Sequence, residues 1–343
     1  MLDDNTRLFD VMSEDMAASG YAVDEYWKRL QNGNRRLALD RLKQFRNGGF
    51  SSYEGTLKKA RRFAKRFPLR AALHVEKVLK SRGYSVPDTF ERDDVAGLRN
   101  WYGETIFNVL FAKDKRLWQI SDSGIGNPHD VIRMGGKTYT HSFLIFFHRY
   151  LMMNDLFSLD AVNCFLEVGG SYGGQIEVLR KLHPRMKFCL VEIPPQLYVA
   201  NQYLSAVFPG EVVTYEETRT LKTLSRDMFG KRSIAVIAPW QLPDVAVGTF
   251  DAFTNQRSFQ EMSQDTVRSY CAHVRRTVKS AVLLFEHRHG HPLVKQPVGR
   301  EDYEAYLAPE FRLTRAIEEN FHEAELPSGT VCLFNDVYLF ERI

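Results

Sequence analysis

The pattern of hydrophobic and polar positions changes character about halfway along the chain. From about residue 161, short apolar runs alternate with segments of helical period, which predicts strands separated by helices. The expected strands are residues 163–168, 187–193, 233–238, 249–254 and 280–286. The expected helices between them are residues 174–182, 195–207 and 263–277. Such alternation predicts an α/β fold, in which a mainly parallel sheet is covered by helices on both faces.

The last apolar segments, residues 331–334 and 337–341, predict a closing antiparallel pair at one edge of this sheet. The first half of the chain has a helical pattern instead. Apolar residues recur at helical spacing in residues 35–45 and 57–67, Pro68 opens a further helix, and residues 140–151 are strongly apolar. We therefore predict two parts. Residues 1–150 form a mostly helical region that binds substrate or mediates oligomerisation, and residues 151–343 form a nucleotide-binding domain.

Composition is typical of a soluble globular protein. Of the 343 residues, 44% are hydrophobic and 26% charged, and no run reaches the roughly 18 apolar residues of a membrane span. The N-terminus lacks the basic and apolar segments of a signal peptide. The four cysteines stand in apolar contexts without Cys-x-x-Cys spacing, which favours buried free thiols in a reducing compartment. We therefore expect a cytoplasmic protein.

The most informative motif is Phe165-Leu-Glu-Val-Gly-Gly-Ser-Tyr-Gly-Gly174, a buried strand that enters a glycine turn and then a helix. Glu167 precedes the first glycine by two positions, and Glu192 ends the next expected strand. Two carboxylates at the carboxyl ends of parallel strands predict a nucleotide pocket. One interpretation is a dinucleotide site, because Gly169, Ser171 and Gly174 resemble a dinucleotide fingerprint and Glu192 stands where a ribose ligand is expected.

The other interpretation is S-adenosylmethionine, whose sulfonium and ammonium groups are cationic. Glu167 suits a cation but would repel a pyrophosphate, and Glu192 can bind ribose hydroxyls in either case. Small residues let the backbone approach the cofactor. A purely structural turn is the third alternative. The residues expected to bind the cofactor are Glu167, Gly169, Gly170, Ser171, Tyr172, Gly173, Glu192, Ile193, Pro194, Ala238, Pro239, Trp240 and Asn255.

Further motifs make the interpretation more specific. Ala238-Pro-Trp-Gln-Leu-Pro243 and Phe250-Asp-Ala-Phe-Thr-Asn-Gln-Arg-Ser-Phe-Gln-Glu-Met262 resemble segments of the sugar O-methyltransferase family, as do the glycine turn, Glu192-Ile-Pro194 and Ile125-Gly-Asn-Pro128. The resemblance covers about residues 118–288, and residues 1–100 do not share it. It implies a Rossmann-like class I methyltransferase that methylates a sugar hydroxyl, in polysaccharide or glycosylated natural-product synthesis.

Three residues are candidates for the base that such a reaction needs, because a sugar hydroxyl is a poor nucleophile. Glu261 is a base or sugar ligand, or alternatively a carboxylate that stabilises a helix N-terminus. His287 is a base or a surface-loop residue, and its alternation with His289 and His291 would suit a metal, which we do not expect. His141 is a base or a histidine satisfied by its surroundings. Asn255 is expected to bind cofactor or substrate, and the rings of Trp240 and Tyr172 either stack on a ligand or pack in the core.

Charge is unevenly distributed although the net charge is only +4. Residues 28–82 contain 17 Lys or Arg against three acidic residues. This segment is either a solvated helical face or a surface for an anionic acceptor, such as a nucleotide sugar or a glycan at a membrane surface. Few aromatic residues interleave with the charges, so nucleic acid is not the expected partner.

Two alternatives to a sugar O-methyltransferase stay open at this point. One is a nicotinamide-dependent sugar-nucleotide oxidoreductase, and the other is a non-catalytic binding protein with a methyltransferase fold. Methylation of a nucleic-acid amine is disfavoured, because the position after the fourth strand reads Thr254-Asn-Gln-Arg and not Asn/Asp-Pro-Pro-Tyr/Phe.

Overall fold

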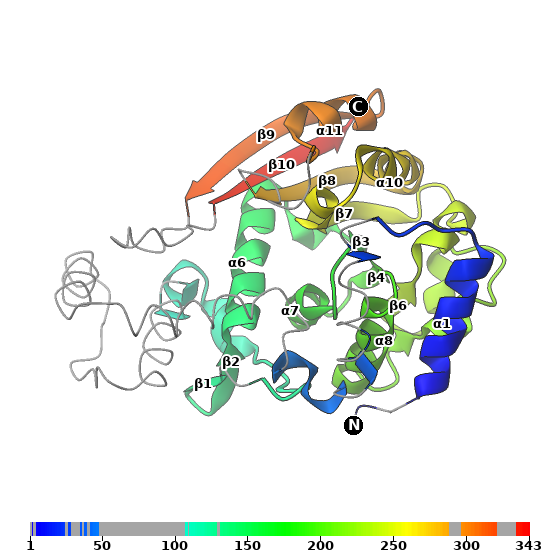
Figure 1. Ribbon diagram of the computed structural model, residues 1–343. Coiled ribbons are helices and arrows are strands. Elements are labelled where there is room, and N and C mark those ends of the chain that lie inside the picture. The colour runs from blue at the N-terminus through cyan, green and yellow to red at the C-terminus, as the bar shows by residue number, and fades with distance from the viewer. Residues whose placement is uncertain are drawn as a thin grey trace.

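Within the described residues, the protein is built around one twisted, eight-stranded sheet, seen in the computed structural model of Figure 1. The structure describes residues 2, 5–24, 27–28, 35, 38–39, 42–47, 107–108, 110–128, 131–287, 296–320 and 334–343. The strand order is β5-β6-β4-β3-β7-β8-β10-β9. The strands are β3 (Cys164–Val168), β4 (Lys187–Val191), β5 (Val212–Val213), β6 (Ile234–Ile237), β7 (Phe250–Gln256), β8 (Val278–His287), β9 (Phe311–Asn320) and β10 (Phe334–Arg342).

The strands from β5 to β8 are parallel, and β10 runs antiparallel to both β8 and β9. This confirms the predicted α/β class and its mainly parallel sheet. The predicted closing pair was wrong in its partners, however. Asn335 and Asp336, which resemble turn residues, pair with the ends of both neighbours, so that β10 continues through them and pairs with β9. Residues 331–333 lie outside the described part of the chain.

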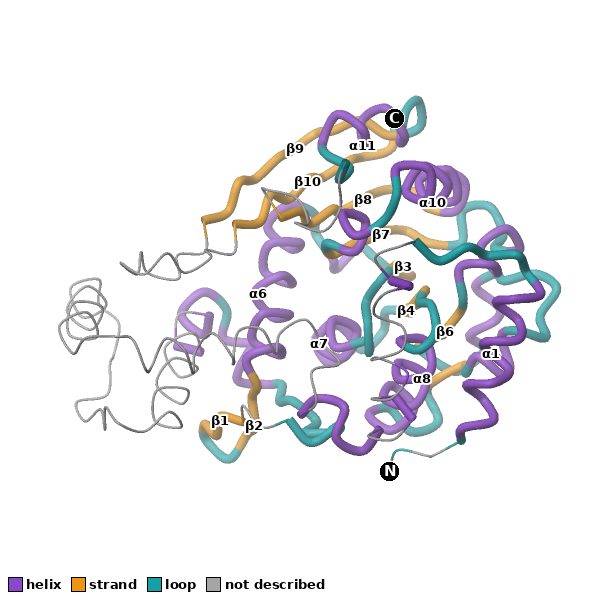
Figure 2. Tube along the Cα trace, in the orientation of Figure 1, coloured by secondary structure: helices purple, strands orange, loops and turns teal. Residues whose placement is uncertain are grey.

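Helices cover both faces of the sheet. Successive side chains of a strand point to opposite faces, and apolar side chains on both faces require a cover. Phe165, Phe188 and Leu190 face a core shared with α1 (Thr6–Ala18), α6 (His141–Leu156), α7 (Gly174–Leu182) and α8 (Gln196–Val207). Leu166, Cys189 and their neighbours face a second core shared with α10 (Gln264–Thr277) and α11 (Arg300–Leu307). Figure 2 shows α1 lying beside α8, at the opposite end of the sheet from β9.

The helix predicted over residues 140–151 is confirmed as α6, one of the most buried elements of the molecule. The side chain of Thr140 caps it by accepting a hydrogen bond from the amide of Phe143 (3.2 Å). The short hairpin of β1 (Val131–Met134) and β2 (Lys137–Thr140), which the sequence did not predict, leads into α6. α6 packs on α7, so residues 141–156 belong to the body of the α/β fold.

Most of the basic N-terminal segment lies outside the described residues, including the helices expected at 57–67 and after Pro68. The described residues between 35 and 47 include helical positions and the 3-10 segment η1 (Leu42–Asn47). Cys164, Cys189 and Cys271 are buried free thiols, as predicted. Within the described part of the chain, no helix combines the length and the apolar character needed to cross a membrane.

Candidate functional site

The glycine turn after β3 is shaped by two close approaches. Gly169 has φ +74°, and a Cβ there would lie 1.9 Å from Oγ of Ser258. A Cβ on Gly170 would lie 2.6 Å from the carboxyl carbon of Glu167. These glycines therefore let the η6 segment (Ser258–Glu261) and the Glu167 side chain come against the backbone of the turn.

Glu192 is held against the same turn from the end of β4. Its Oε2 accepts a hydrogen bond from the amide of Ser171 (2.8 Å), and its Oε1 accepts one from the amide of Ile193 (3.0 Å). Burial raises the pKa of Glu192 to about 7, against the effect of these two amide donors. Ile193 and Pro194 then lead into α8. The two carboxylates predicted from the sequence therefore do flank one turn.

Glu167 is buried and incompletely satisfied. Its side chain belongs to a residue that is 1% exposed, and its Oε2 has no hydrogen-bond partner among the described residues. Burial raises the pKa of Glu167 to about 8. The charge of Arg149 opposes this rise, and that of Glu192 adds to it. A buried carboxylate without a partner is costly, so a cationic ligand at this position would stabilise it.

Arg149 on α6 is a site residue that the sequence analysis missed. It is 4% exposed, and its Nη1 donates to Oε1 of Gln256 at the end of β7 (2.7 Å). Its Nε and the Nε2 of Gln256 have no partner among the described residues. An arginine within the apolar residues 142–153 was the available signal, because a buried charge requires a partner.

Glu261 completes a group of three carboxyl residues, Glu167, Glu192 and Glu261, here called the carboxylate trio. Burial and the charge of Glu192 raise the pKa of Glu261 to about 8, while Arg257 opposes the rise. Glu192 thus acts on both other members. At the N-terminus of α10, Ser263 is the cap and Asp265 is the acidic residue of the first turn. Both alternatives for Glu261 stay predictions.

Asn255 departs from the prediction that it binds cofactor or substrate. It is fully buried, and its Nδ2 donates to the carbonyl of Val168 (2.9 Å) and to Oγ of Ser258 (2.6 Å). Its Oδ1 accepts a hydrogen bond from the amide of Phe259 (3.0 Å). The amide group is therefore used within the protein, where it fixes η6 against the end of β3.

Tyr172 takes the core-packing alternative. It is 2% exposed, and its ring lies 5.3 Å from that of Phe45 and 5.0 Å from that of Tyr203. The guanidinium of Arg46 lies over its face at 5.5 Å. The side chain therefore supports the turn from behind and is not available for stacking on a ligand. Gly173 follows it at φ +88° and is the N-cap of α7.

Trp240 lies at the carboxyl end of β6, at the edge of the site. Ala238 and Pro239 are buried at the end of β6, and the half-buried Trp240 follows them in η5 (Pro239–Asp244). Its Nε1 donates to the hydroxyl of Tyr215 (3.2 Å). Since β6 lies beside β4, this segment stands next to Glu192, where the base of a nucleoside would extend from its ribose.

The structure does not test the predictions that His141 or His287 is the general base. His141 is the first residue of α6, beside Thr140, whose hydroxyl binds Asp122 and Arg46. His287 ends β8 opposite Asn335, and its side chain lies outside the described part of the structure, as do His289 and His291. Both catalytic assignments stay predictions. Among the residues that the structure describes, no group of three or more His, Cys, Asp or Glu could hold a metal ion.

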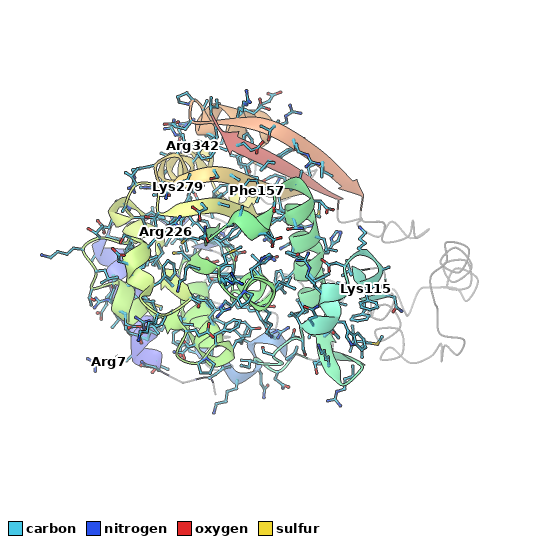
Figure 3. The ribbon with its side chains drawn as sticks, turned by 180° about the vertical axis from the view of Figure 1, so that it is seen from behind. Arg7, Lys115, Phe157, Arg226, Lys279 and Arg342 are labelled. Carbon is cyan, nitrogen blue, oxygen red and sulfur yellow. The ribbon has the colours of Figure 1, made fainter. Side chains whose placement is uncertain are left out.

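Asp251, an acidic residue of the motif at 250–262, lies at the opposite edge of the sheet. It stands near the start of β7, where it accepts hydrogen bonds from the amides of Asn163 (2.9 Å) and Cys164 (3.0 Å) and from Arg226 (2.5 Å). Figure 3 labels Arg226 in the view from behind. Asp251 therefore anchors the amino end of β3, far from the carboxyl-end site.

The described residues fit S-adenosylmethionine. Glu167 offers a buried carboxylate for its ammonium group, Arg149 a buried cation for its carboxylate, and Glu192 two oxygens beside the glycine turn for its ribose. Glu167 and Arg149 carry opposite charges, and each has a polar atom without a partner in the part of the chain that the structure describes, which suits a zwitterionic amino-acid group better than a pyrophosphate.

Comparisons with known proteins give structural similarity without sequence similarity. No protein-family model matches the chain, and no curated protein matches it. Solved structures similar to it include magnesium protoporphyrin IX methyltransferase from Synechocystis with bound S-adenosylmethionine, at 9% identity and TM-score 0.39, covering 59% of this chain and 80% of that one. A SAM-dependent methyltransferase from Aquifex aeolicus has 12% identity and TM-score 0.34 over 52% of this chain and 82% of its own. The mitomycin 7-O-methyltransferase has 11% identity and TM-score 0.34, covering 74% and 70%. These scores are too low for the likenesses to establish a cofactor or a substrate.

Proposed function

We propose that this protein is an S-adenosylmethionine-dependent O-methyltransferase that methylates a sugar hydroxyl. The observation that carries the proposal is the carboxylate trio around the glycine turn, in which Oε2 of Glu167 has no partner among the described residues and is influenced by the charge of the buried Arg149. The sugar itself is inferred from the sequence motifs of residues 165–174, 238–243 and 250–262. Polysaccharide or glycosylated natural-product synthesis is the expected setting.

The cofactor supplies a methyl group activated by a sulfonium. Glu167 and Arg149 bind its amino-acid end, and Glu192 binds its ribose, which together fix the orientation of the reacting carbon. Orientation of this kind supplies a large part of the rate of a two-substrate transfer. Buried carboxylates also stabilise a cationic ligand more strongly than exposed ones, because water does not screen them.

Glu261 is the proposed general base, which accepts the proton of the acceptor hydroxyl. A pKa of about 8 is well suited to proton transfer near neutral pH. A bound cation beside the trio lowers the pKa of its members, so that cofactor binding itself favours the ionised base. His287 and His141 are retained as alternative bases.

An anionic acceptor stays a proposal that depends on the basic residues between 28 and 82, most of which lie outside the described structure. The trio is itself acidic. We therefore propose that the hydroxyl-bearing end of the acceptor near Glu261 is neutral, whatever charge the rest of the acceptor carries.

Calorimetry with S-adenosylhomocysteine and with NAD, followed by mass spectrometry, tests the function. We expect S-adenosylhomocysteine to bind and NAD not to bind. A pooled nucleotide-sugar and glycan extract, incubated with isotope-labelled cofactor, should then contain labelled methyl ethers. Tight NAD binding without S-adenosylhomocysteine binding would favour the oxidoreductase. Cofactor binding without methylation of any acceptor would favour a non-catalytic binding protein.

A further inference from the structure

A short N-terminal segment crosses the sheet at the candidate site. α1 packs beside α8 on one face of the sheet, whereas Tyr21, three residues after its end, contacts Tyr270 of α10 on the other face. Residues 19–24, here called the strap, must therefore pass over an edge of the sheet. Figure 2 shows the strap as a loop that leaves the end of α1 toward β3 and β7.

The contacts of Tyr21 place this crossing at the carboxyl edge. Its hydroxyl lies 2.9 Å from that of Tyr270, and its ring centroid lies 6.0 Å from that of Trp240. Burial raises the pKa of Tyr21 to about 12, and the charges of Asp24 and Glu192 add to the rise. Tyr21 thus stands among Trp240, Tyr270 and the carboxylate that faces the glycine turn.

The end of α1 from which the strap departs is firmly held. Asp15 accepts hydrogen bonds from Nε (2.6 Å) and Nη2 (2.7 Å) of Arg219 and from the hydroxyl of Tyr215 (2.8 Å). The hydroxyl of Tyr215 in turn accepts a hydrogen bond from Nε1 of Trp240. One connected set of hydrogen bonds therefore joins α1 to Trp240, which also contacts the strap.

We propose that the strap roofs the adenosine end of the cofactor site, and that Tyr21 is a further cofactor-binding residue whose ring covers the adenosine. This inference rests on the proposed function. Tyr21 lies where the adenosine is expected. Glu192 is the proposed ribose ligand, Trp240 follows the end of the neighbouring strand β6, and Tyr21 lies near both. The hydrogen bond between the hydroxyls of Tyr21 and Tyr270 holds the Tyr21 ring over the carboxyl edge of the sheet. A phenylalanine at position 21 could not form this bond.

Titration calorimetry of full-length variants with S-adenosylhomocysteine tests whether Tyr21 covers the adenosine, the arrangement here called the roof. Loss of one aromatic–base contact is expected to weaken binding about 5- to 100-fold in Tyr21→Ala. Tyr306→Ala is the matched control, since it removes a partly buried ring on α11 that contacts Arg268, and its affinity should equal that of the wild type. Tyr21→Leu gives the same comparison if Tyr21→Ala melts below the assay temperature.

A double-mutant cycle tests the hydroxyl pair. Tyr21→Phe and Tyr270→Phe each break the same hydrogen bond, so each should weaken binding about 2- to 10-fold, and the double variant no more than either alone. Hydrogen exchange adds a readout that does not depend on substitution: amides of residues 19–24 should become protected when S-adenosylhomocysteine binds.

Three results would overturn the roof while leaving the proposed function intact: wild-type affinity in both Tyr21→Ala and Tyr21→Leu, additive effects in the cycle, or unchanged exchange of the strap in the complex. Failure of the wild-type protein to bind S-adenosylhomocysteine would instead overturn the cofactor assignment, and the roof with it.

Discussion

Glu167 combines two properties that suit the proposed binding of a cationic ligand. It is buried with a raised pKa, and one of its oxygens has no partner among the described residues. Such a group weakens the free protein and stabilises the complex with a cation. Stability and affinity should therefore respond in opposite directions when its charge is removed.

Glu167→Gln is expected to lower the affinity for S-adenosylhomocysteine about 10- to 100-fold, because a charged hydrogen bond is worth about 1.5–3 kcal/mol. The same variant should melt at the same or a higher temperature than the wild type at pH 8.5, since no buried charge forms. Calorimetry and thermal melting measure both. Glu216→Gln, on the exposed surface of α9 (Tyr215–Thr218), is the control. Unchanged affinity in Glu167→Gln would remove this carboxylate from the site.

Glu261→Gln separates the base from the cofactor ligands. Loss of a general base should reduce turnover about 10²- to 10⁴-fold. Affinity for S-adenosylhomocysteine should change little, because the assigned ligands of the cofactor are Glu167, Arg149 and Glu192. Single-turnover methylation at saturating cofactor, with calorimetry, gives the two values. An equal loss of affinity and turnover would instead make Glu261 a cofactor ligand.

At the scale of elements, η1 is held behind the glycine turn by a buried ion pair between Arg46 and Asp122, here called the clasp. Arg46 binds both carboxylate oxygens of Asp122 at 2.8 and 2.7 Å, and the two side chains are 4% and 0% exposed. Burial tends to raise the pKa of Asp122, but Arg46 and the hydrogen bonds of Thr140 and Gly124 lower it overall. Since Arg46 also covers Tyr172, the clasp joins the N-terminal segment to the turn.

Arg46→Ala should lower the free energy of unfolding by about 3–5 kcal/mol, because it leaves Asp122 buried without its partner. Denaturant unfolding measures the loss. Arg268→Ala, which removes the exposed pair with Asp265, should cost less than about 1 kcal/mol. The double variant Arg46→Ala/Asp122→Ala should recover part of the stability, since no unpaired charge remains. A cost in Arg46→Ala as small as in Arg268→Ala would contradict the clasp.

The whole molecule should show a pH dependence set by its buried carboxyl groups. All members of the trio bind protons more tightly when folded, with pKa values of about 8, 7 and 8 against an ordinary 4.5. The folded chain then holds more protons than the unfolded chain, so stability falls as pH rises toward 8. His183 and His273 have pKa values lowered by burial and act oppositely below about 6.5.

We therefore expect the melting temperature of the free protein to fall between about pH 6.5 and 8. Saturating S-adenosylhomocysteine should flatten this fall, because its ammonium group favours ionised Glu167. Thermal melting across this range, with and without the ligand, is the measurement. A melting temperature that rises with pH in the free protein would contradict the raised pKa values.

Local pattern determined the strands, the helices between them and the two carboxylates at the glycine turn, because burial and backbone geometry repeat at fixed spacings along the chain. The same pattern misplaced the closing strand pair, since Asn335 and Asp336 read as a turn although both of their neighbours in the sheet pair with them. Local propensity yields to pairing partners that lie far away in sequence.

Side-chain roles at the site were decided by tertiary structure. The side-chain amide of Asn255 is hydrogen-bonded to Val168, Ser258 and Phe259. Arg149 comes to the candidate site from α6, and Tyr21 comes from a segment that precedes every strand of the sheet in the sequence. Arg149 and Gln256 are separated by 107 positions in the sequence, and Tyr21 and Tyr270 by 249. The local hydrophobic pattern does not encode contacts between such distant residues. The sequence thus determined the glycine turn and the carboxylates beside it. The tertiary structure decided which side chains are available for the proposed ligand, because hydrogen bonds within the protein occupy some candidates and distant elements supply others.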